Sequence, residues 1–379
     1  MRILYNHRIA SKDGQYVHVE ELTNAMLEQG HTLLFVSPGF TKNTEFGNDG
    51  GISTKLKSLL PGGLYEILEL LYSVVVGFKL IGGILKFKPD IIYERYNLYQ
   101  PAGVIVARLF KLPLLLEINA PLADERKKYS NLSLPRLASY VENFTWKHAG
   151  ALLPVSDVLS KIVINNSGVP ESRTHVIHNG INKNILSSVF SDKPESHGDT
   201  ITIGFVGFIN KWHRLDLVIE AISEFPTKNI KFICIGEGDI KKDLEDLVIK
   251  RNVSDKVEFK GIIDRGEIFH YIKEFDIALQ PSVTPYASPL KLFEYMAAGC
   301  LIVAPRTDNI CEILNDENAI LFDMNNERDF TIKLKQCIDN IKSYDSLRIN
   351  VKETIGIKKF TWQDNASAVI RIANNLLGK

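Results

Sequence analysis

Two side chains on one short segment, Lys291 and Glu294, have the chemistry to hold a phosphate and a sugar. Ser288 suits a helix N-cap, Pro289 suits the first helical position, and Gly299 is placed to end the helix. The start of a helix offers unpaired N–H groups and a positive dipole end, which favour an anion. A lysine in that first turn needs a nearby anion or is merely solvated. Glu294, within one turn, offers oxygens to two hydroxyls of a sugar diol.

The elements that must position these residues alternate along the whole chain between strand-like and helical patterns. Such alternation predicts an α/β protein with mostly parallel sheets, and because it occurs twice we expect two doubly wound, Rossmann-like domains. The expected strands are 3–5, 32–36, 91–93, 114–118 and 151–154, then 201–206, 231–235, 257–260, 277–280 and 301–304. The expected helices are 17–28, 65–86, 101–109, 134–147 and 158–165, then 215–224, 239–250, 267–273, 289–298, 327–340 and 360–377.

A polar stretch with a proline and a glycine, residues 187–200, predicts the linker between the domains. We therefore expect an N-terminal, acceptor-side domain over 1–186 and a C-terminal nucleotide-sugar domain over 201–359. Residues 360–379 are expected to form a helix that returns towards the N-terminal domain.

The bulk composition describes an ordinary soluble protein and excludes a nucleic-acid binder. The chain has 379 residues, with 45 Lys and Arg against 45 Asp and Glu. All four cysteines lie in the second half without metal-type spacing, which indicates buried thiols in a reducing compartment, hence the cytoplasm. The most apolar run, 67–87, contains Glu69, Lys79 and Lys86, so we prefer a core helix to a membrane-surface helix. The basic cluster 126–128 leaves contact with the cytoplasmic face of a membrane as an expectation.

Glycine-containing motifs follow one another in a fixed order. Gly14 lies after the first strand, Asn179-Gly180 lies near the domain junction, and Phe205-Val-Gly207 lies at the next strand end. They precede 235–238, 257–261, 276–282 and the Ser288–Gly299 segment. This ordered set resembles the retaining glycosyltransferases of family 4, which have the GT-B fold. Trp212-His213 and Ser-Pro-Leu-Lys before the glutamate fit a subset of that family.

The resemblance implies a donor site in a cleft, mostly on the second domain. Glu294 is then expected to hold the nucleotide ribose, and Ile263 to flank the base. Gly14 is expected to let backbone approach the donor from the first domain. The diphosphate is expected to meet the turn formed by Ser288, Pro289, Leu290 and Lys291.

Several positions depart from the family pattern. Tyr286 replaces the usual first glutamate, and Phe208 replaces an arginine that normally follows Gly207. His213-Arg214 replaces a Lys-Gly pair, so the basic role is expected at Lys211, His213, Arg214 or Lys291. Asn119 replaces the usual histidine of the first domain. We take Lys291, His213 and Asn119 as the catalytic candidates.

The expected activity is metal-independent transfer of a sugar from a nucleotide diphosphate sugar to a glycan or lipid-linked acceptor, in bacterial surface polysaccharide synthesis. No cofactor or nucleic-acid partner is expected. Gly236-Glu-Gly238 is only a partial dinucleotide fingerprint, because Lys241 occupies the third glycine position, and no Asp-x-Asp triplet is present to hold a metal. Two alternatives stay open: a sugar-nucleotide epimerase on the same scaffold, and a non-catalytic partner subunit that no longer binds the donor.

Overall fold

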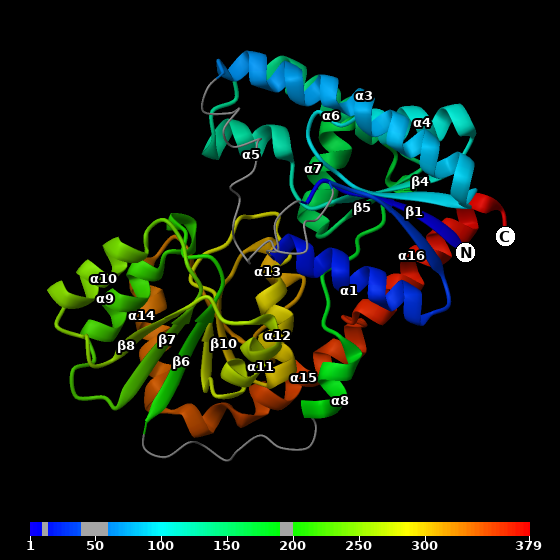
Figure 1. Cartoon of the computed structure of the whole chain (residues 1–379). Helices are drawn as coiled ribbons and strands as arrows, with labels where there is room; N and C mark the ends of the chain where they lie inside the picture. Colours follow the sequence, from blue (N-terminus) through cyan, green and yellow to red (C-terminus); the bar gives the residue numbers. More distant parts are fainter. Residues whose placement is uncertain (10–13, 39–59, 190–199) are drawn as a thin grey trace. The chain divides into compact units, whose positions relative to one another are not determined.

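The computed structural model describes residues 1–9, 14–38, 60–189 and 200–379. They form two compact units, one of residues 1–178 with 362–379 and the other of residues 179–361 (Figure 1). The division falls at His178. Residues 179–186, which the sequence assigned to the first domain, pack with the second unit because α8, Lys183–Val189, lies against α12, Leu290–Ala298.

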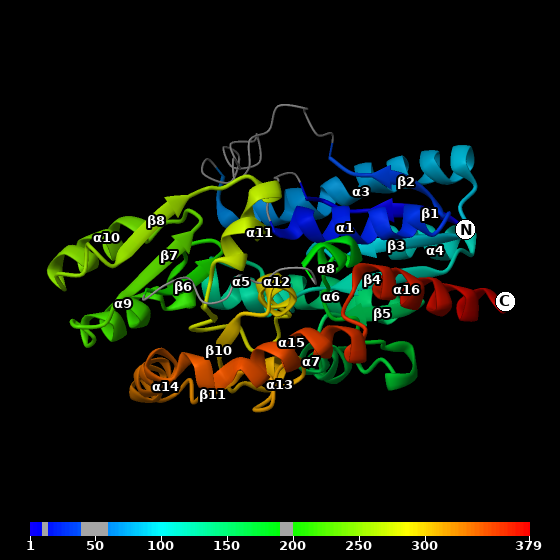
Figure 2. The same ribbon diagram turned by 90° about the horizontal axis from the view of Figure 1, so that it is seen from below.

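The first unit is built on a five-stranded parallel sheet in the order β2-β1-β3-β4-β5. Its last helix comes from the far end of the chain and lies beside α1 (Figures 1 and 2), where Gln29 Nε2 donates to the carbonyl of Gln363 and to Ser367 Oγ. The strands are β1 Arg2–Asn6, β2 Thr32–Val36, β3 Ile91–Arg95, β4 Leu114–Ile118 and β5 Ala151–Pro154. The helices are α1 Gly14–Glu28, α3 Gly62–Phe87, α4 Ala102–Phe110, α5 Leu122–Tyr129, α6 Pro135–His148, α7 Asp157–Ser167 and α16 Trp362–Leu377.

The second unit is built on a six-stranded parallel sheet in the order β11-β10-β9-β6-β7-β8. Successive strand residues enter different apolar clusters: Phe205 and Cys234 in one, Val206 and Ile235 in the other. Both faces of the sheet are therefore covered, as in a doubly wound domain. The strands are β6 Ile201–Val206, β7 Ile230–Ile235, β8 Val257–Gly261, β9 Ile277–Leu279, β10 Leu301–Pro305 and β11 Ile320–Phe322. The remaining helices are α9 Leu215–Ser223, α10 Lys241–Lys250, α11 Arg265–Lys273, α13 Asp308–Cys311, α14 Glu327–Asp339 and α15 Asp345–Lys358.

Every strand expected from the sequence is present, and the α/β class is confirmed. The sequence missed elements with weak apolar periodicity. Helix α5 is mostly charged and buries only Ala123, while β11 is three residues long and is defined by pairing with β10. Tertiary pairing fixes such short elements more than local propensity does.

The expectation of a core helix over residues 67–87 is wrong. Helix α3 is long and apolar enough to cross a membrane by length and composition, the single such helix within the described ranges, and 28% of its most apolar window is buried. Its buried face contains Glu66, Glu69 and Ser73 beside Val76, while Phe78 is exposed.

Candidate functional site

Lys291 and Glu294 lie one turn apart on α12, as expected, and Gly299 ends that helix in the left-handed conformation. The expected N-cap role of Ser288 is wrong, because Pro289 occupies that position and no side chain caps the helix. The Ser288 hydroxyl instead accepts from the Asn179 N–H at 3.2 Å, and Asn179 Nδ2 donates to the Ser288 carbonyl at 2.5 Å. The turn at Asn179, more than a hundred residues earlier in the chain, thus holds the start of α12 through two hydrogen bonds.

The amine of Lys291 lies over an aromatic ring rather than in free solvent. Its Nζ is 3.9 Å from the centre of the Phe205 ring and 3.5 Å from Nε2 of His213. Burial lowers the pKa of Lys291 to about 7. Burial, with the nearby Lys291 charge, lowers the pKa of His213 to about 2, so His213 is neutral at physiological pH. Near pH 7 the Lys291 amine is therefore partly protonated, while His213 stays neutral.

Glycines let the ends of two strands, β6 and β7, come close together beside this amine. Gly207, with φ +144°, would place a Cβ 2.8 Å from Lys291 Nζ. A Cβ on Gly236 would meet the carbonyl oxygen of Gly207 at 2.0 Å, and one on Gly238 that of Ile209 at 2.2 Å. The Gly236-Glu-Gly238 motif thus has a packing role: it lets the loop after β7 lie against the loop after β6.

Glu294 has a partner that the sequence did not suggest. Its side chain is 8% exposed and forms an ion pair with Arg265, the first residue of α11. Asp264 caps that helix by accepting from the Gly266 N–H at 2.9 Å. Ile263, one residue earlier, is half-buried against the core of the unit. A carboxylate can accept several hydrogen bonds, so Glu294 can keep Arg265 and still bind hydroxyls.

The loop before α12 is held by one buried asparagine. Asn309 Nδ2 donates to the carbonyls of Thr284 and Ala287, at 3.1 and 2.7 Å. These bonds fix the backbone on both sides of Tyr286, which is half-buried.

The remaining basic candidates lie in the turn after β6. Lys211 is exposed and begins a short 3-10 helix, Lys211–His213. Arg214 has φ +53° and its guanidinium pairs with Asp216 at 3.0 Å and with Glu327 at 2.7 Å. Because two carboxylates already engage Arg214, Lys291 and Lys211 are the better candidates for a phosphate.

The first unit holds its own cluster of polar residues around the buried Glu117 at the end of β4. His18 Nε2 is 3.3 Å from Glu117 Oε2, the Tyr93 hydroxyl donates to the same oxygen at 2.9 Å, and Arg95 pairs with Oε1. Asn119 Nδ2 donates to Glu117 Oε1 at 2.6 Å. Burial alone would raise the pKa of Glu117, but the charges of His18 and Arg95 and these hydrogen bonds hold it well below its usual range. The carboxylate therefore fixes the orientation of Asn119.

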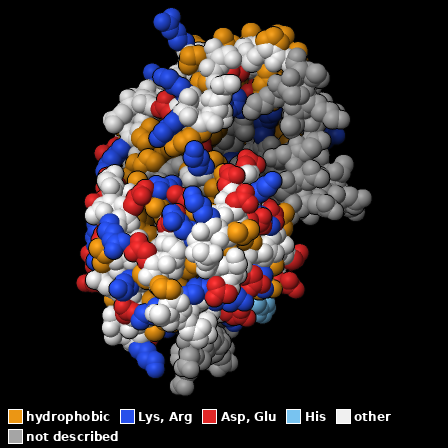
Figure 3. Space-filling view, turned by 90° about the vertical axis from the view of Figure 1, so that its left-hand side faces the viewer, with side chains coloured by type: hydrophobic (Ala, Val, Ile, Leu, Met, Phe, Trp, Pro, Cys, Tyr) orange, Lys and Arg blue, Asp and Glu red, His pale blue; other side chains and the backbone are white. Residues whose placement is uncertain are grey.

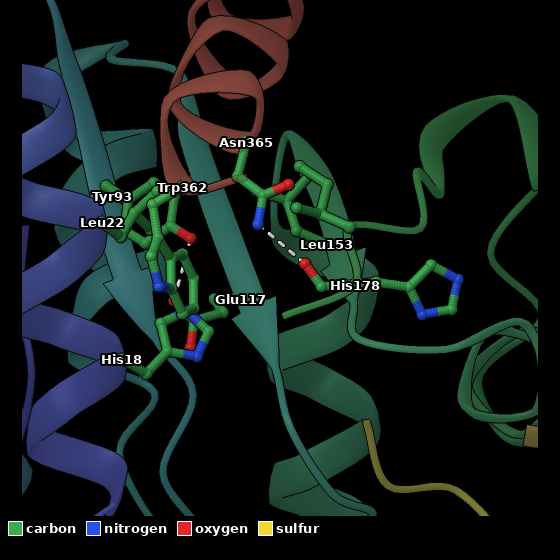
Figure 4. A pocket seen from close by; sticks show the side chains of 9 residues that line it. His18, Leu22, Tyr93, Glu117, Leu153, His178, Trp362 and Asn365 are labelled. Atoms are coloured by element: carbon green, nitrogen blue, oxygen red, sulfur yellow. Dashed lines mark hydrogen bonds and ion pairs between the residues drawn. The ribbon is translucent and has the colours of Figure 1, made fainter. Parts of the chain in front are cut away.

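A small pocket opens beside this cluster within the first unit (Figure 4). The His18 side chain faces Glu117, and the Trp362 ring lies 4.8 Å from the His18 ring, centre to centre. Asn365 Nδ2 donates to the carbonyl of His178 at 2.7 Å, while the His178 ring points away. Gly14 lies apart from this pocket lining and begins α1.

The structure brings together Gly207, His213, Lys291 and Glu294 at the carboxyl ends of the strands in the second unit, and it adds Arg265 and Phe205. Arg265 lies two residues after Ile263, which the resemblance had placed beside the base, and this proximity in sequence is the signal that points to it. No local sequence pattern predicted that Glu117 would contact His18 and Arg95 and would accept a hydrogen bond from Asn119.

Models of two known sequence families match adjoining parts of the chain. The one described as Glycosyltransferase Family 4 matches residues 12–184, and the one described as Glycosyl transferases group 1 matches residues 188–354. The chain belongs to the glycosyltransferases of the group 1 and family 4 type. The N-terminal half of this glycosyltransferase thus matches one family model and the C-terminal half matches the other.

Similar proteins carry the same description. An uncharacterized glycosyltransferase of Methanocaldococcus jannaschii is 28% identical over 207 residues, 54% of this chain and 55% of the relative, so the match spans about half of that relative's length. A second uncharacterized glycosyltransferase of the same organism is 22% identical over 97% of this chain and 96% of the relative.

Solved structures show the same architecture. Anabaena HepE in complex with UDP matches with a TM-score of 0.76 and 16% identity, covering 99% of this chain and 100% of HepE. WaaG, a glycosyltransferase involved in lipopolysaccharide biosynthesis, matches with a TM-score of 0.71 and 13% identity over all of both chains. This glycosyltransferase therefore has the GT-B fold.

Proposed function

We propose that this glycosyltransferase moves a sugar from a nucleoside diphosphate sugar to a glycan or lipid-linked acceptor, with retention of configuration, in the synthesis of a bacterial surface polysaccharide. The observation that carries the proposal is the placement of a half-buried lysine and a buried glutamate one turn apart on α12, with the lysine amine beside Gly207. The similar HepE structures contain UDP, one of them together with glucose, which supports a nucleotide-sugar donor.

The chemistry asks the protein to stabilise a departing diphosphate and to align the acceptor. Lys291 supplies a cation to the leaving phosphates from the first turn of α12, where the dipole favours anions as well. Neutral His213 next to it can donate one hydrogen bond without adding charge. Glu294 accepts from the two ribose hydroxyls. Ser288, Pro289 and Leu290 form the turn that meets the diphosphate, Tyr286 lies in the loop before it, and Ile263 flanks the base.

The roles of Gly14 and Asn119 towards the donor rest on the family resemblance, and no metal or cofactor is part of the proposal. The cytoplasm is the proposed location. Three of the four cysteines, Cys234, Cys300 and Cys337, are buried free thiols, which suit a reducing compartment.

Titration of the whole protein with UDP by calorimetry tests the donor site. Glu294→Gln is expected to fold normally and to lose about 1–3 kcal/mol of UDP binding free energy, because a charge-assisted hydrogen bond to ribose becomes a neutral one. Glu245→Gln, on the exposed side of α10, is the matched control and is expected to bind UDP like the parent. An unchanged dissociation constant for Glu294→Gln contradicts the ribose assignment.

Titration with nucleotide sugars in place of UDP, followed by analysis of the recovered sugar, separates the alternatives. A parent protein that binds no nucleotide favours a non-catalytic partner subunit. Binding followed by isomerisation of the donor sugar without any acceptor favours an epimerase.

A further inference from the structure

The outer face of α3 is apolar, which is the reverse of an ordinary surface helix. Phe78 is 71% exposed, and α4, which packs against α3 through Gly77, adds Leu109 at 69%. Large exposed apolar patches on soluble proteins mark interaction sites. The exposed apolar residues of α3 are Leu64, Ile67, Leu68, Leu71, Val74, Val75, Phe78 and Leu85; together with Ile105 and Leu109 of α4 they form what we call the outer face. Figure 3 shows exposed hydrophobic side chains along its upper edge, where Figure 1 places α3.

The two acids of α3 point inward and are fully engaged. Glu66 accepts from the backbone N–H groups of Ser133 and Leu134, at 2.6 and 2.8 Å, and from the Tyr99 hydroxyl at 2.8 Å. Glu69 binds Arg126 through two bonds of 2.6 and 3.0 Å. Removing α3 from the unit would leave these carboxylates unpaired, so the helix is fixed lengthwise on the protein and cannot cross a bilayer at no cost.

The charges exposed on α3 and α4, both fully described, are all positive. Lys79 and Lys86 are seven residues apart and so share one edge of the outer face. Three further exposed cations, Lys88, Arg108 and Lys111, lie at the ends of α3 and α4.

The lysine edge continues into a hollow in the same unit. Lys79 and Tyr72 of α3 line it together with His7 and Arg8, and none of the described residues that line it is acidic. Arg8 lies over the Tyr72 ring at 4.9 Å, and its buried Nη1 has no hydrogen-bond partner within the described ranges. Burial, and then the charge of Arg95, lower the pKa of His7 to about 4, so the charged groups of the hollow are Arg8 and Lys79. Arg8 therefore adds a further cation beside Lys79 at this end of the lysine edge.

We propose that the outer face docks this protein on the surface of a bilayer that contains anionic phospholipids, with the Lys79–Lys86 edge and Arg8 meeting the headgroups. A second copy of the chain fits less well. Two outer faces would bring cations together with no exposed acid on either helix to pair with them. A lipid surface satisfies both features, because it accepts apolar side chains at the acyl boundary and attracts cations to its phosphates.

Flotation of the whole protein with vesicles tests the proposal. The parent is expected to bind vesicles of mixed phosphatidylcholine and phosphatidylglycerol more tightly than phosphatidylcholine alone, and less tightly as salt rises. Phe78→Asp is expected to weaken binding at least roughly tenfold, through lost apolar burial and an added negative charge. Each of Lys79→Gln and Lys86→Gln is expected to weaken binding about fivefold, and to mixed vesicles only. Arg8→Gln is expected to reduce the preference for phosphatidylglycerol.

Matched controls lie in the second unit. Ile357→Asp alters a residue of α15 that is 78% exposed, and Lys250→Gln an exposed lysine of α10; both are expected to bind vesicles like the parent. UDP affinity and melting temperature are expected to stay unchanged in all variants. The UDP measurement therefore tests the donor site, and the vesicle measurement tests the docking proposal independently.

Four outcomes overturn the proposal. If the parent binds no vesicles, or if the Phe78→Asp variant binds them like the parent, the outer face does not dock on lipid. A parent dimer that Phe78→Asp dissolves, with no vesicle binding, makes the outer face a subunit interface. Protein that stays with the vesicles after an alkaline carbonate wash is embedded rather than docked.

Discussion

Lys291 is the residue whose charge depends most on what occupies the site. Its pKa is lowered to about 7 by burial, so the amine is mostly neutral at pH 8 when the site is empty. A bound diphosphate favours the charged amine and raises that pKa. We therefore expect UDP binding at pH 8 to take up a proton, and UDP affinity to fall as pH rises above 7.

Calorimetry in buffers of different ionisation enthalpy measures this uptake. Lys291→Met, which keeps the bulk of the side chain, is expected to bind UDP more weakly and without proton uptake. Equal uptake in Lys291→Met and the parent would assign the proton to another group.

Gly207 is the residue whose backbone brings the β6 end close to this amine. Gly207→Ala is expected to lower the free energy of unfolding by about 1–3 kcal/mol, because its φ is nearly restricted to glycine and a Cβ would lie 2.8 Å from Lys291 Nζ. Gly356→Ala, in α15 where a Cβ meets nothing within 4 Å, is the control and is expected to stabilise by up to about 1 kcal/mol. Urea unfolding of the two variants measures both. Equal midpoints for Gly207→Ala and the parent would show that the loop relaxes freely.

At the scale of elements, α3 and α5 are joined by the pair between Glu69 and Arg126. The sequence grouped Arg126 with Lys127 and Lys128 as one basic cluster facing a membrane. The structure separates them, because Nη1 and Nη2 of Arg126 both donate to Glu69, whereas Lys127 and Lys128 are exposed.

Arg126→Gln is therefore expected to lower the free energy of unfolding by about 1–3 kcal/mol, since it leaves a buried carboxylate without its charged partner. The neighbouring Lys127→Gln is expected to change stability by less than about 0.5 kcal/mol, as most surface substitutions do. Chemical denaturation monitored by circular dichroism compares them. If Arg126→Gln lost vesicle binding without losing stability, Arg126 would contact the membrane, as the sequence predicted.

At the scale of the whole molecule, the described ranges contain no group of three or more His, Cys, Asp or Glu residues placed to hold a metal ion. With Lys291 and the start of α12 as the proposed phosphate site, donor turnover is expected to survive EDTA. Release of the nucleoside diphosphate from a nucleotide sugar that the parent turns over, with and without chelator, measures this. Loss of turnover in EDTA that Mg²⁺ or Mn²⁺ restores would require a metal in the mechanism.

The sequence by itself determined the α/β class, every strand except β11, and the helix that carries Lys291 and Glu294. These follow from local patterns: apolar runs of strand length, a proline near the start of α12, and a glycine that ends it in the left-handed conformation. Local patterns misplaced the cap, because Ser288 is held by Asn179, whose position depends on the fold.

Only the tertiary structure decided what each side chain meets. Glu294 pairs with Arg265, Lys291 lies over Phe205, and Glu117 holds Asn119, and most of these partners are far apart in sequence. Helix α3 shows the same limit, because its composition indicates a core helix. Its acids face inward because Arg126 of α5 neutralises Glu69 and groups in neighbouring loops hydrogen-bond Glu66, and its apolar residues are left outside. Which face of a helix is buried depends on the partners it meets, and only the folded chain brings them together.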